Sequence, residues 1–310
     1  MNDTAPHRPG RPDLLGFWLA GLGAVCFSGK AIVIKLGYRH GVDATTFLAM
    51  RMLLSLPFFL VALLVVQWRY RYPRLSGRDA GIIVIAGLLG YYIASLLDFI
   101  GLEYISAALE RLILFTYPSI VLLMTCVLKR RWPARRHVTA LLISYAGLLL
   151  VFGHEMNLEG AHVAWGSTLV FLSSLAYALY LIVSSSLLQR LGTIRVTSSA
   201  TLVSATVILV HISLRQPWSI IWQQPPAVWQ LSLVNAIFCT VLPVFMVMLA
   251  ISKIGAPRVA QIGMIGPVVT IAMGAVLLGE TFSVFHAAGT ALVLAGVALL
   301  SGSRAATARV

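Results

Sequence analysis

The chain has 310 residues, of which 59% are hydrophobic and 11% are charged, and its mean hydropathy is +0.90. A water-soluble domain cannot hide that much apolar surface, so the composition excludes an ordinary soluble protein and makes lipid the solvent for much of the chain. The formal net charge of +13 would suggest a nucleic-acid partner in a soluble protein, but cationic loops of a membrane protein explain it better, and we expect no nucleic acid to bind.

Ten apolar segments approach the length of about 20 residues that a helix needs to cross a bilayer. In chain order they cover residues 14–37, 44–67, 80–101, 104–128, 137–153, 162–188, 196–214, 227–251, 256–279 and 283–301. The predicted fold is therefore an all-α polytopic membrane protein with ten transmembrane helices. Residues 1–13 and 302–310 remain as short N-terminal and C-terminal tails.

The two halves of the chain repeat each other. Glu103–Gly153 can be laid over Ser252–Gly302 without a gap, which places Pro118 on Pro267. We expect two five-helix repeats, over 14–153 and 162–301. Because five is an odd number, the second repeat is inverted in the membrane. Two inverted halves that rock around one central site are typical of secondary transporters.

Basic residues predict the orientation, because Lys and Arg concentrate in cytoplasmic loops. If the N-terminus is cytoplasmic, the inner segments hold nearly all the basic loop residues, including Lys129–Arg131. The outer loops then carry only Arg39 and Arg215, together with acidic Glu155, Glu159 and Glu280. This asymmetry predicts a multi-pass protein of a bacterial-type inner membrane with both termini in the cytoplasm.

Four strings carry a resemblance to a known family. They are CFSGKAIVIKLGY at 26–38, FLAMRMLLSLP at 47–57, GLEYISAALERLILFTYPSIVLLMTCVLKRRW at 101–132 and KIGAPRVAQIGMIGPVVTIAMGAVLLGETF at 253–282. With the order of the elements, they resemble the drug/metabolite transporter superfamily, in particular its ten-helix EamA-type members. The resemblance implies transport of amino acids, other metabolites or sugar conjugates. It departs from the family where Lys129–Arg131 replaces a Gly-Glu pair that the first copy often carries.

Six charged residues lie within the predicted spans, all of them in the first half: Lys30, Lys35, Arg51, Asp98, Glu110 and Arg111. Each costs about 2.5–3.5 kcal/mol at the centre of a membrane helix, so these side chains must pair, face water or reach the interface. They come from four helices at similar depth in the outer half of the membrane. We expect one net-positive polar chamber, which attracts an anion or the carboxylate of a zwitterion.

These charges are expected to have different roles. We predict that Lys30, Arg51 and Arg111 bind substrate, with the planar fork of Arg111 on a carboxylate. Glu110 and Asp98 are the candidates for proton coupling. Glu110 would pair with Arg51 or Lys30, and Asp98 with Lys30 or Lys35. The alternatives are a purely structural salt-bridge network and, for Lys35, a side chain that snorkels to the interface.

Polar residues in other spans complete the predicted site. Further substrate contacts are expected from Tyr91, Tyr177, Asn235 and Gln261, although helix–helix hydrogen bonding is an alternative role for all four. Pro118 and Pro267 are predicted as hinges, because proline removes a backbone hydrogen bond and bends a helix, and a fixed kink needed for packing is the alternative. Small residues at Ala140, Gly147, Gly289 and Gly296 assign the fifth and tenth helices to packing.

The sequence contains no phosphate loop, HExxH motif or nucleophile elbow, so we predict no enzyme, catalytic residue, metal or cofactor. The predicted function is export of a small carboxylate-bearing, amino-acid-like metabolite by proton antiport or exchange. The expected partners are the lipid bilayer, an anionic or zwitterionic substrate, and a proton or counter-substrate, with the chain a monomer or homodimer. An importer or exchanger of organic anions and a non-transporting scaffold or embedded enzyme remain alternatives.

Overall fold

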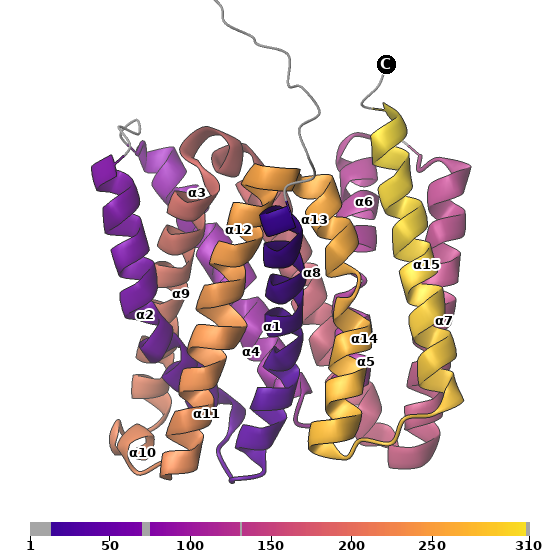
Figure 1. The fold of residues 1–310 in the computed structure, drawn as a ribbon. Coiled ribbons are helices and arrows are strands. Elements are labelled where there is room, and N and C mark those ends of the chain that lie inside the picture. The colour runs from indigo at the N-terminus through magenta and orange to yellow at the C-terminus, as the bar shows by residue number, and fades with distance from the viewer. Residues whose placement is uncertain (1–13, 70–74, 131, 308–310) are drawn as a thin grey trace, which may run out of the picture.

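The computed structural model describes residues 14–69, 75–130 and 132–307, and within them every regular element is a helix (Figure 1). The first half contains α1 (Leu14–Tyr38), α2 (Ala44–Arg69), α3 (Gly77–Gly87), η1 (Leu88–Ile93), α4 (Ala94–Gly101), α5 (Ala107–Leu114), α6 (Tyr117–Leu128) and α7 (Arg135–Glu159). The second half contains α8 (Ala161–Leu191), α9 (Thr193–Arg215), α10 (Ser219–Trp222), α11 (Pro226–Ala236), η2 (Ile237–Val241), α12 (Leu242–Ile254), α13 (Ala256–Gly263), α14 (Gly266–Met273), η3 (Gly274–Leu278) and α15 (Val284–Thr307).

Among the described residues, nine helical segments are long and apolar enough to cross a membrane, and Val284–Leu299 forms a shorter apolar helix. Several spans consist of consecutive elements: α3, η1 and α4 form Gly77–Gly101, and α11, η2 and α12 form Pro226–Ile254. The all-α polytopic prediction is therefore confirmed, with each predicted span matched by a helical segment. The predicted N-terminal tail, 1–13, and the basic residue Arg131 lie outside the described residues, as does the side chain of Glu159. Helix α15 extends through Thr307, into the segment predicted as the C-terminal tail.

The end of the bundle where α1 begins and α15 ends is here called the near face, and the opposite end the far face (Figure 1). Helix α1 runs from the near face to the far face, whereas α8, the first helix of the second half, runs the other way. Five crossings separate the two helices, which gives them opposite directions in the membrane. This is the inverted arrangement that the repeat predicted.

The repeat extends to irregular details of the backbone. The π-helices η1 and η2 begin at Leu88 and Ile237, which are related by the same offset that lays Glu103 over Ser252. A π-turn inserts one extra residue into a helix and turns the following side chains to a new face. The two halves therefore share a built-in irregularity that hydropathy could not reveal.

The fourth and ninth spans are broken at matching places. Non-helical turns around Phe115–Thr116 and Met264–Ile265 separate α5 from α6 and α13 from α14. Pro118 lies in the first turn of α6 and so cannot donate to the Leu114 carbonyl, which instead accepts a hydrogen bond of 3.5 Å from Ser174 of α8. Pro267 lies likewise in the first turn of α14. Each proline starts a new helix, a sharper interruption than the bend expected from the sequence.

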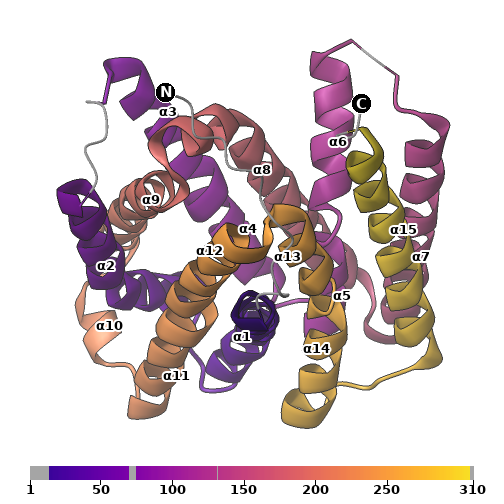
Figure 2. The ribbon, with the colours of Figure 1, turned by 45° about the horizontal axis from the view of Figure 1, so that its top comes forward.

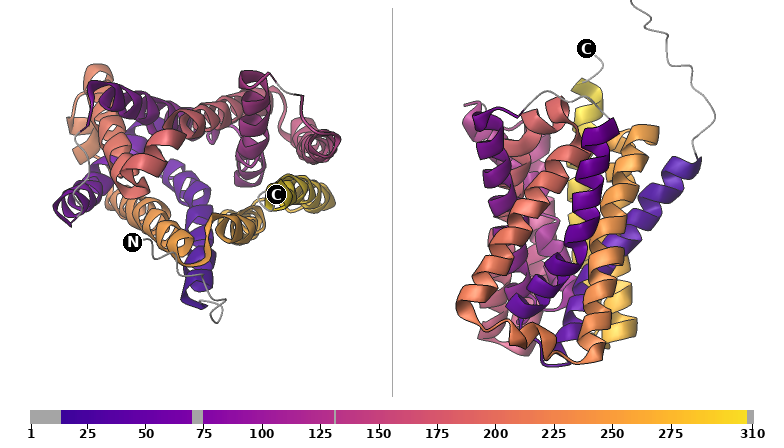
Figure 3. Two further views of the ribbon diagram at one scale, coloured as in Figure 1. Left: turned by 90° about the horizontal axis from the view of Figure 1, so that it is seen from above. Right: turned by 90° about the vertical axis from the view of Figure 1, so that its left-hand side faces the viewer.

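Contacts between the halves follow the same symmetry. Helix α2 packs on its counterpart α9 and α7 on its counterpart α15, while α1 packs on α12 in the same way as α8 packs on α4. The α7–α15 pair stands at one side of the bundle (Figure 2; Figure 3). There a Cβ on Gly147 would lie 2.6 Å from the carbonyl oxygen of Gly289, so the two backbones touch. The predicted packing role of these small residues is confirmed.

Candidate functional site

Three charged residues meet within the first half, and two of them, Asp98 and Glu110, are buried. The ammonium nitrogen of Lys30 on α1 lies 2.6 Å from Oδ2 of Asp98 on α4 and 3.3 Å from Oε1 of Glu110 on α5. The two carboxylic side chains are 3% and 0% exposed. Because one cation serves two carboxylates, the group contains more acceptors than the lysine alone can neutralise.

The pairing follows part of the prediction. Lys30 joins both Asp98 and Glu110, which were among the expected alternatives. Lys35, in contrast, pairs with Glu280 of the second half. Its ammonium also donates to the backbone carbonyl of Ile105 over 2.7 Å, so the residue predicted to snorkel has two polar partners within the protein.

Arg51 of α2 lies beside this group. Its Nη2 donates to Ser95 over 3.1 Å, and its guanidinium carbon lies 4.8 Å from the centre of the Phe99 ring. Its Nε is buried without a hydrogen-bond partner in the described part of the chain. The predicted alternative of an Arg51–Glu110 pair is not observed there.

Arg111 of α5, like Arg51, forms no ion pair among the described residues and lies in an apolar surrounding. Its closest polar contact is a 3.4 Å hydrogen bond from Nη2 to Ser28, and its guanidinium carbon lies 5.7 Å from the centre of each of the Phe27 and Phe115 rings. The residue is 8% exposed, and within the described residues its guanidinium forms no ion pair with a carboxylate. A buried guanidinium with unused donors is suited to an anion that enters from outside the fold.

The other predicted contact residues lie in separate places. Tyr91 of η1 is hydrogen-bonded to the hydroxyl of Tyr180 over 3.3 Å, and Tyr177 packs edge-on against Tyr117, so these tyrosines form an aromatic cluster where η1, α6 and α8 meet. Asn235 of α11 is fully buried, with both amide atoms lacking a partner in the described residues. Gln261 is exposed on α13, apart from the Lys30 group.

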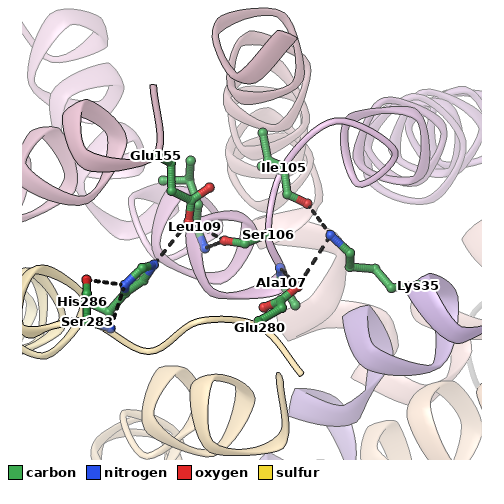
Figure 4. Close-up of polar contacts among 9 residues, drawn as sticks. All are labelled: Lys35, Ile105, Ser106, Ala107, Leu109, Glu155, Glu280, Ser283 and His286. Carbon is green, nitrogen blue, oxygen red and sulfur yellow. Dashed lines mark hydrogen bonds and ion pairs between the residues drawn. The ribbon is translucent and has the colours of Figure 1, made fainter. Parts of the chain in front are cut away.

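A second polar cluster lies toward the far face, and the sequence did not reveal it (Figure 4). Glu280, which follows η3, accepts a 2.9 Å hydrogen bond from the Ala107 backbone N–H at the start of α5 and lies 3.4 Å from Lys35. Glu155 of α7 accepts a hydrogen bond from Ser106 and lies 3.2 Å from Nε2 of His286 on α15. A cavity of about 90 Å³ is lined by residues of both groups.

The placement of Glu155 corrects two expectations. It was assigned to an outer loop, but α7 continues to Glu159 and leaves the Glu155 side chain 4% exposed. The helices assigned to packing alone, α7 and α15, therefore also contribute Glu155 and His286 to a polar cluster. The signal that could have found it is a Glu and a His at the outer ends of two helices already predicted to pack.

Comparisons with known proteins agree with this architecture. The model of the EamA-like transporter family matches residues 14–153 and again 164–302. The chain is 32% identical to the uncharacterized transporter YcbK of Bacillus subtilis (strain 168), over 86% of each chain. It is 26% identical to the uncharacterized transporter YyaM of the same organism, over 71% of this chain and 72% of that one. A crystal structure of a protein that is 17% identical aligns with 93% of this chain and 95% of its own, with a TM-score of 0.63, and so has the same fold.

Proposed function

Because this chain belongs to the EamA-like transporter family and is a multi-pass membrane transporter, we propose that it exports a small carboxylate-bearing metabolite, such as an amino acid, by proton antiport or exchange. The observation that carries the proposal is Arg111, a buried guanidinium without an acidic partner in the described residues, next to a group in which two carboxylates share Lys30.

In this proposal Arg111 binds the substrate carboxylate through its two-pronged donor face, while Arg51 and Lys30 supply further positive charge. The ammonium group of an amino acid would pair with the Glu110 carboxylate and so compete with the proton for it. Substrate and proton then weaken each other's binding, as an antiporter requires.

The remaining predicted contacts have subsidiary roles. Asn235 has a free amide that can bind the polar part of a substrate, and Tyr91 and Tyr177 offer an aromatic wall. Gln261 would reach the path only from the near side. The breaks before Pro118 and Pro267 are the proposed hinges, because α5 and α13 end there and can tilt separately from α6 and α14. The near face is proposed to be cytoplasmic, on the basis of its basic residues.

The test is untargeted metabolite profiling of the medium. Cells that produce the wild type are compared with cells that produce Arg111→Ala or Arg111→Lys at matched membrane abundance. Arg215→Ala, an exposed arginine at the end of α9, is the control. We expect a carboxylate-bearing compound to accumulate with the wild type and the control only, because lysine retains the charge but not the fork. If the medium of wild-type cells contained the same compounds in the same amounts as that of the Arg111 variants, export would be overturned. The same variants would then be compared in uptake of organic anions.

Proton coupling is tested with the identified compound in proteoliposomes. In Glu110→Gln we expect exchange of labelled for unlabelled substrate to persist while transport driven by a pH gradient is lost. Gradient-driven transport that survives in Glu110→Gln would assign the proton to another group.

A further inference from the structure

The segment Ile105–Ala107, which leads into α5, is tied to three other parts of the molecule (Figure 4). The Ile105 carbonyl accepts from Lys35 of α1, the Ser106 hydroxyl donates to Glu155 of α7, and the Ala107 N–H donates to Glu280. Ser106 is also the N-cap of α5, where its oxygen accepts from the Leu109 N–H over 3.0 Å. These contacts hold α5 at the far face, and α5 carries Glu110 and Arg111.

Glu155 is the unusual member of this set. Its Oε1 contacts only Ser106 and His286, and its Oε2 is buried without a hydrogen-bond partner among the described residues. Among the described residues, His286 is therefore the one group in contact with the Glu155 carboxylate that could carry a positive charge. A buried carboxylate is stable when cations or several donors surround it, and becomes protonated when they do not.

The hydrogen bonds of His286 assign it a neutral form. Its Nδ1 faces both donors of Ser283, the backbone N–H at 3.3 Å and the hydroxyl at 2.8 Å. We assign Nδ1 as the acceptor, which leaves Nε2 to carry the hydrogen that points at Glu155. A second proton on His286 would have to displace the Ser283 N–H, which starts helix α15.

The other charged and titratable groups near Glu155 do not neutralise it. His154 stacks on Phe285 with its ring centre 5.7 Å from that of His286, and His162 of α8 stacks on Tyr104. Lys35 and Glu280 line the same cavity but pair with each other. The cavity, of about 90 Å³, is lined by Glu155 and is large enough for water.

We propose that Glu155 is a proton-binding site and that its protonation releases α5 at the far face. The proton adds to the free Oε2 and converts the carboxylate into a carboxylic acid. The hydrogen bonds from Ser106 and His286 then lose their charge assistance, which accounts for about half of the strength of such bonds. Acid on the far side thereby loosens the attachment of α5 to α7. This inference depends on neither the substrate nor the titration of Glu110.

Infrared titration of the purified protein tests whether Glu155 binds the proton. A buried carboxylic acid has a carbonyl stretching band that the carboxylate lacks. We expect a band that grows on acidification of the wild type, disappears in Glu155→Gln, and titrates at a shifted pH in Glu155→Asp. His154→Gln, a change of the adjacent histidine, should leave it intact. A band that is unchanged in Glu155→Gln belongs to another carboxyl group and overturns the proposal.

Thiol reactivity tests whether α5 is released. Cys26, Cys126 and Cys239 are replaced by alanine, and one cysteine is introduced at Ala108, which lines the cavity and is 5% exposed. A matched cysteine at exposed Thr281 corrects for the effect of pH on the thiol itself. Relative to Thr281→Cys, the reactivity of Ala108→Cys should rise severalfold on acidification, and Glu155→Gln should fix it at the high value at every pH. A pH response that persists in Glu155→Gln contradicts the release of α5 by this group. His154→Gln should retain the wild-type response.

Discussion

The two halves of this transporter share much of their backbone and differ in chemistry. Both contain a π-helix in the third span of the half and a break in the fourth, at positions related by one offset. The charges do not follow that offset: Val247, Val259 and Ala260 of the second half stand where the first has Asp98, Glu110 and Arg111. The backbone irregularities are therefore shared by the two halves, while the group of Lys30, Asp98 and Glu110 lies in the first half.

The loop after the fourth span shows the same difference at one residue. Arg130 has a φ of 51°, and its counterpart Gly279 has a φ of 68°, so both occupy the left-handed region. Gly279 is followed by Glu280, which turns inward to Lys35 and α5. In the first half the loop keeps the strained conformation with a cation in place of the glycine. The same backbone turn thus places Glu280 against Lys35 and α5 in the second half and forms part of a basic loop in the first.

The largest expected effect comes from removing the central cation. Lys30→Met leaves Asp98 and Glu110 buried without their shared partner, and unfolding in detergent should become easier by about 3–5 kcal/mol. The triple variant Lys30→Leu, Asp98→Val and Glu110→Val gives the first half the apolar character of the second. We expect it to recover most of the stability and to have no transport. If Lys30→Met unfolds like the wild type, the central group contributes nothing to the fold.

A smaller effect is expected where the halves pack through glycine. A Cβ on Gly289 would lie 2.3 Å from Cγ2 of Val151, so Gly289→Ala should destabilise the protein by about 1–3 kcal/mol. The first half already has alanine at the matching position, Ala140. Gly153→Ala, on the same α7 with no atom near the added methyl group, is the control and should not destabilise. Equal unfolding midpoints for the two alanine variants would mean that α15 shifts freely against α7.

The left-handed positions Arg130 and Gly279 allow the cost of a side chain at the same backbone turn to be compared within one protein. Gly279→Ala should cost about 1–2 kcal/mol, because an alanine is strained at this φ even though no atom crowds it. Arg130→Gly should relieve similar strain and raise the unfolding midpoint slightly. A midpoint that falls in Arg130→Gly would show that the arginine side chain contributes more than its backbone strain removes.

The smallest effect is a pH dependence in the connection before α5. Partial burial raises the pKa of Glu103, against the effect of the Ala44 N–H that donates to its carboxylate, and the Asp43 carboxylate adds to the rise. A raised pKa means that the folded protein binds this proton more tightly than the unfolded chain, so stability falls as the pH rises through the folded pKa.

Glu103→Gln cannot titrate and its amide oxygen can still accept from Ala44. It should match the wild type in acid and become relatively more stable as the pH rises above the usual glutamate value of about 4.3. The second half has Ser252 at this position and lacks the titration. A stability difference that does not change with pH would remove Glu103 as its source.

Much of this fold could be predicted because hydropathy acts locally. A run of apolar residues needs no partner to identify it as a membrane span, and charges inside such runs must meet, as Lys30, Asp98 and Glu110 do. The π-helices could not be predicted, because one extra residue in a turn leaves the apolar run intact. The Glu155 contacts were missed because they depend on where α7 ends and on which helices of opposite halves touch. Gln261 was expected in the substrate site because it is a polar residue within an apolar segment, but it is exposed on α13.

The break at Phe115–Thr116 makes α5 a short rigid lever. Its eight residues span about 12 Å at 1.5 Å per residue, so a tilt of about 10° at the break displaces the far end by about 2 Å. That displacement is enough to break a hydrogen bond of ordinary length. Glu110 and Arg111, near the middle of the rod, would move by about half as much. A small rotation of α5 alone can therefore break its contacts at the far end while the central charges move about half as far.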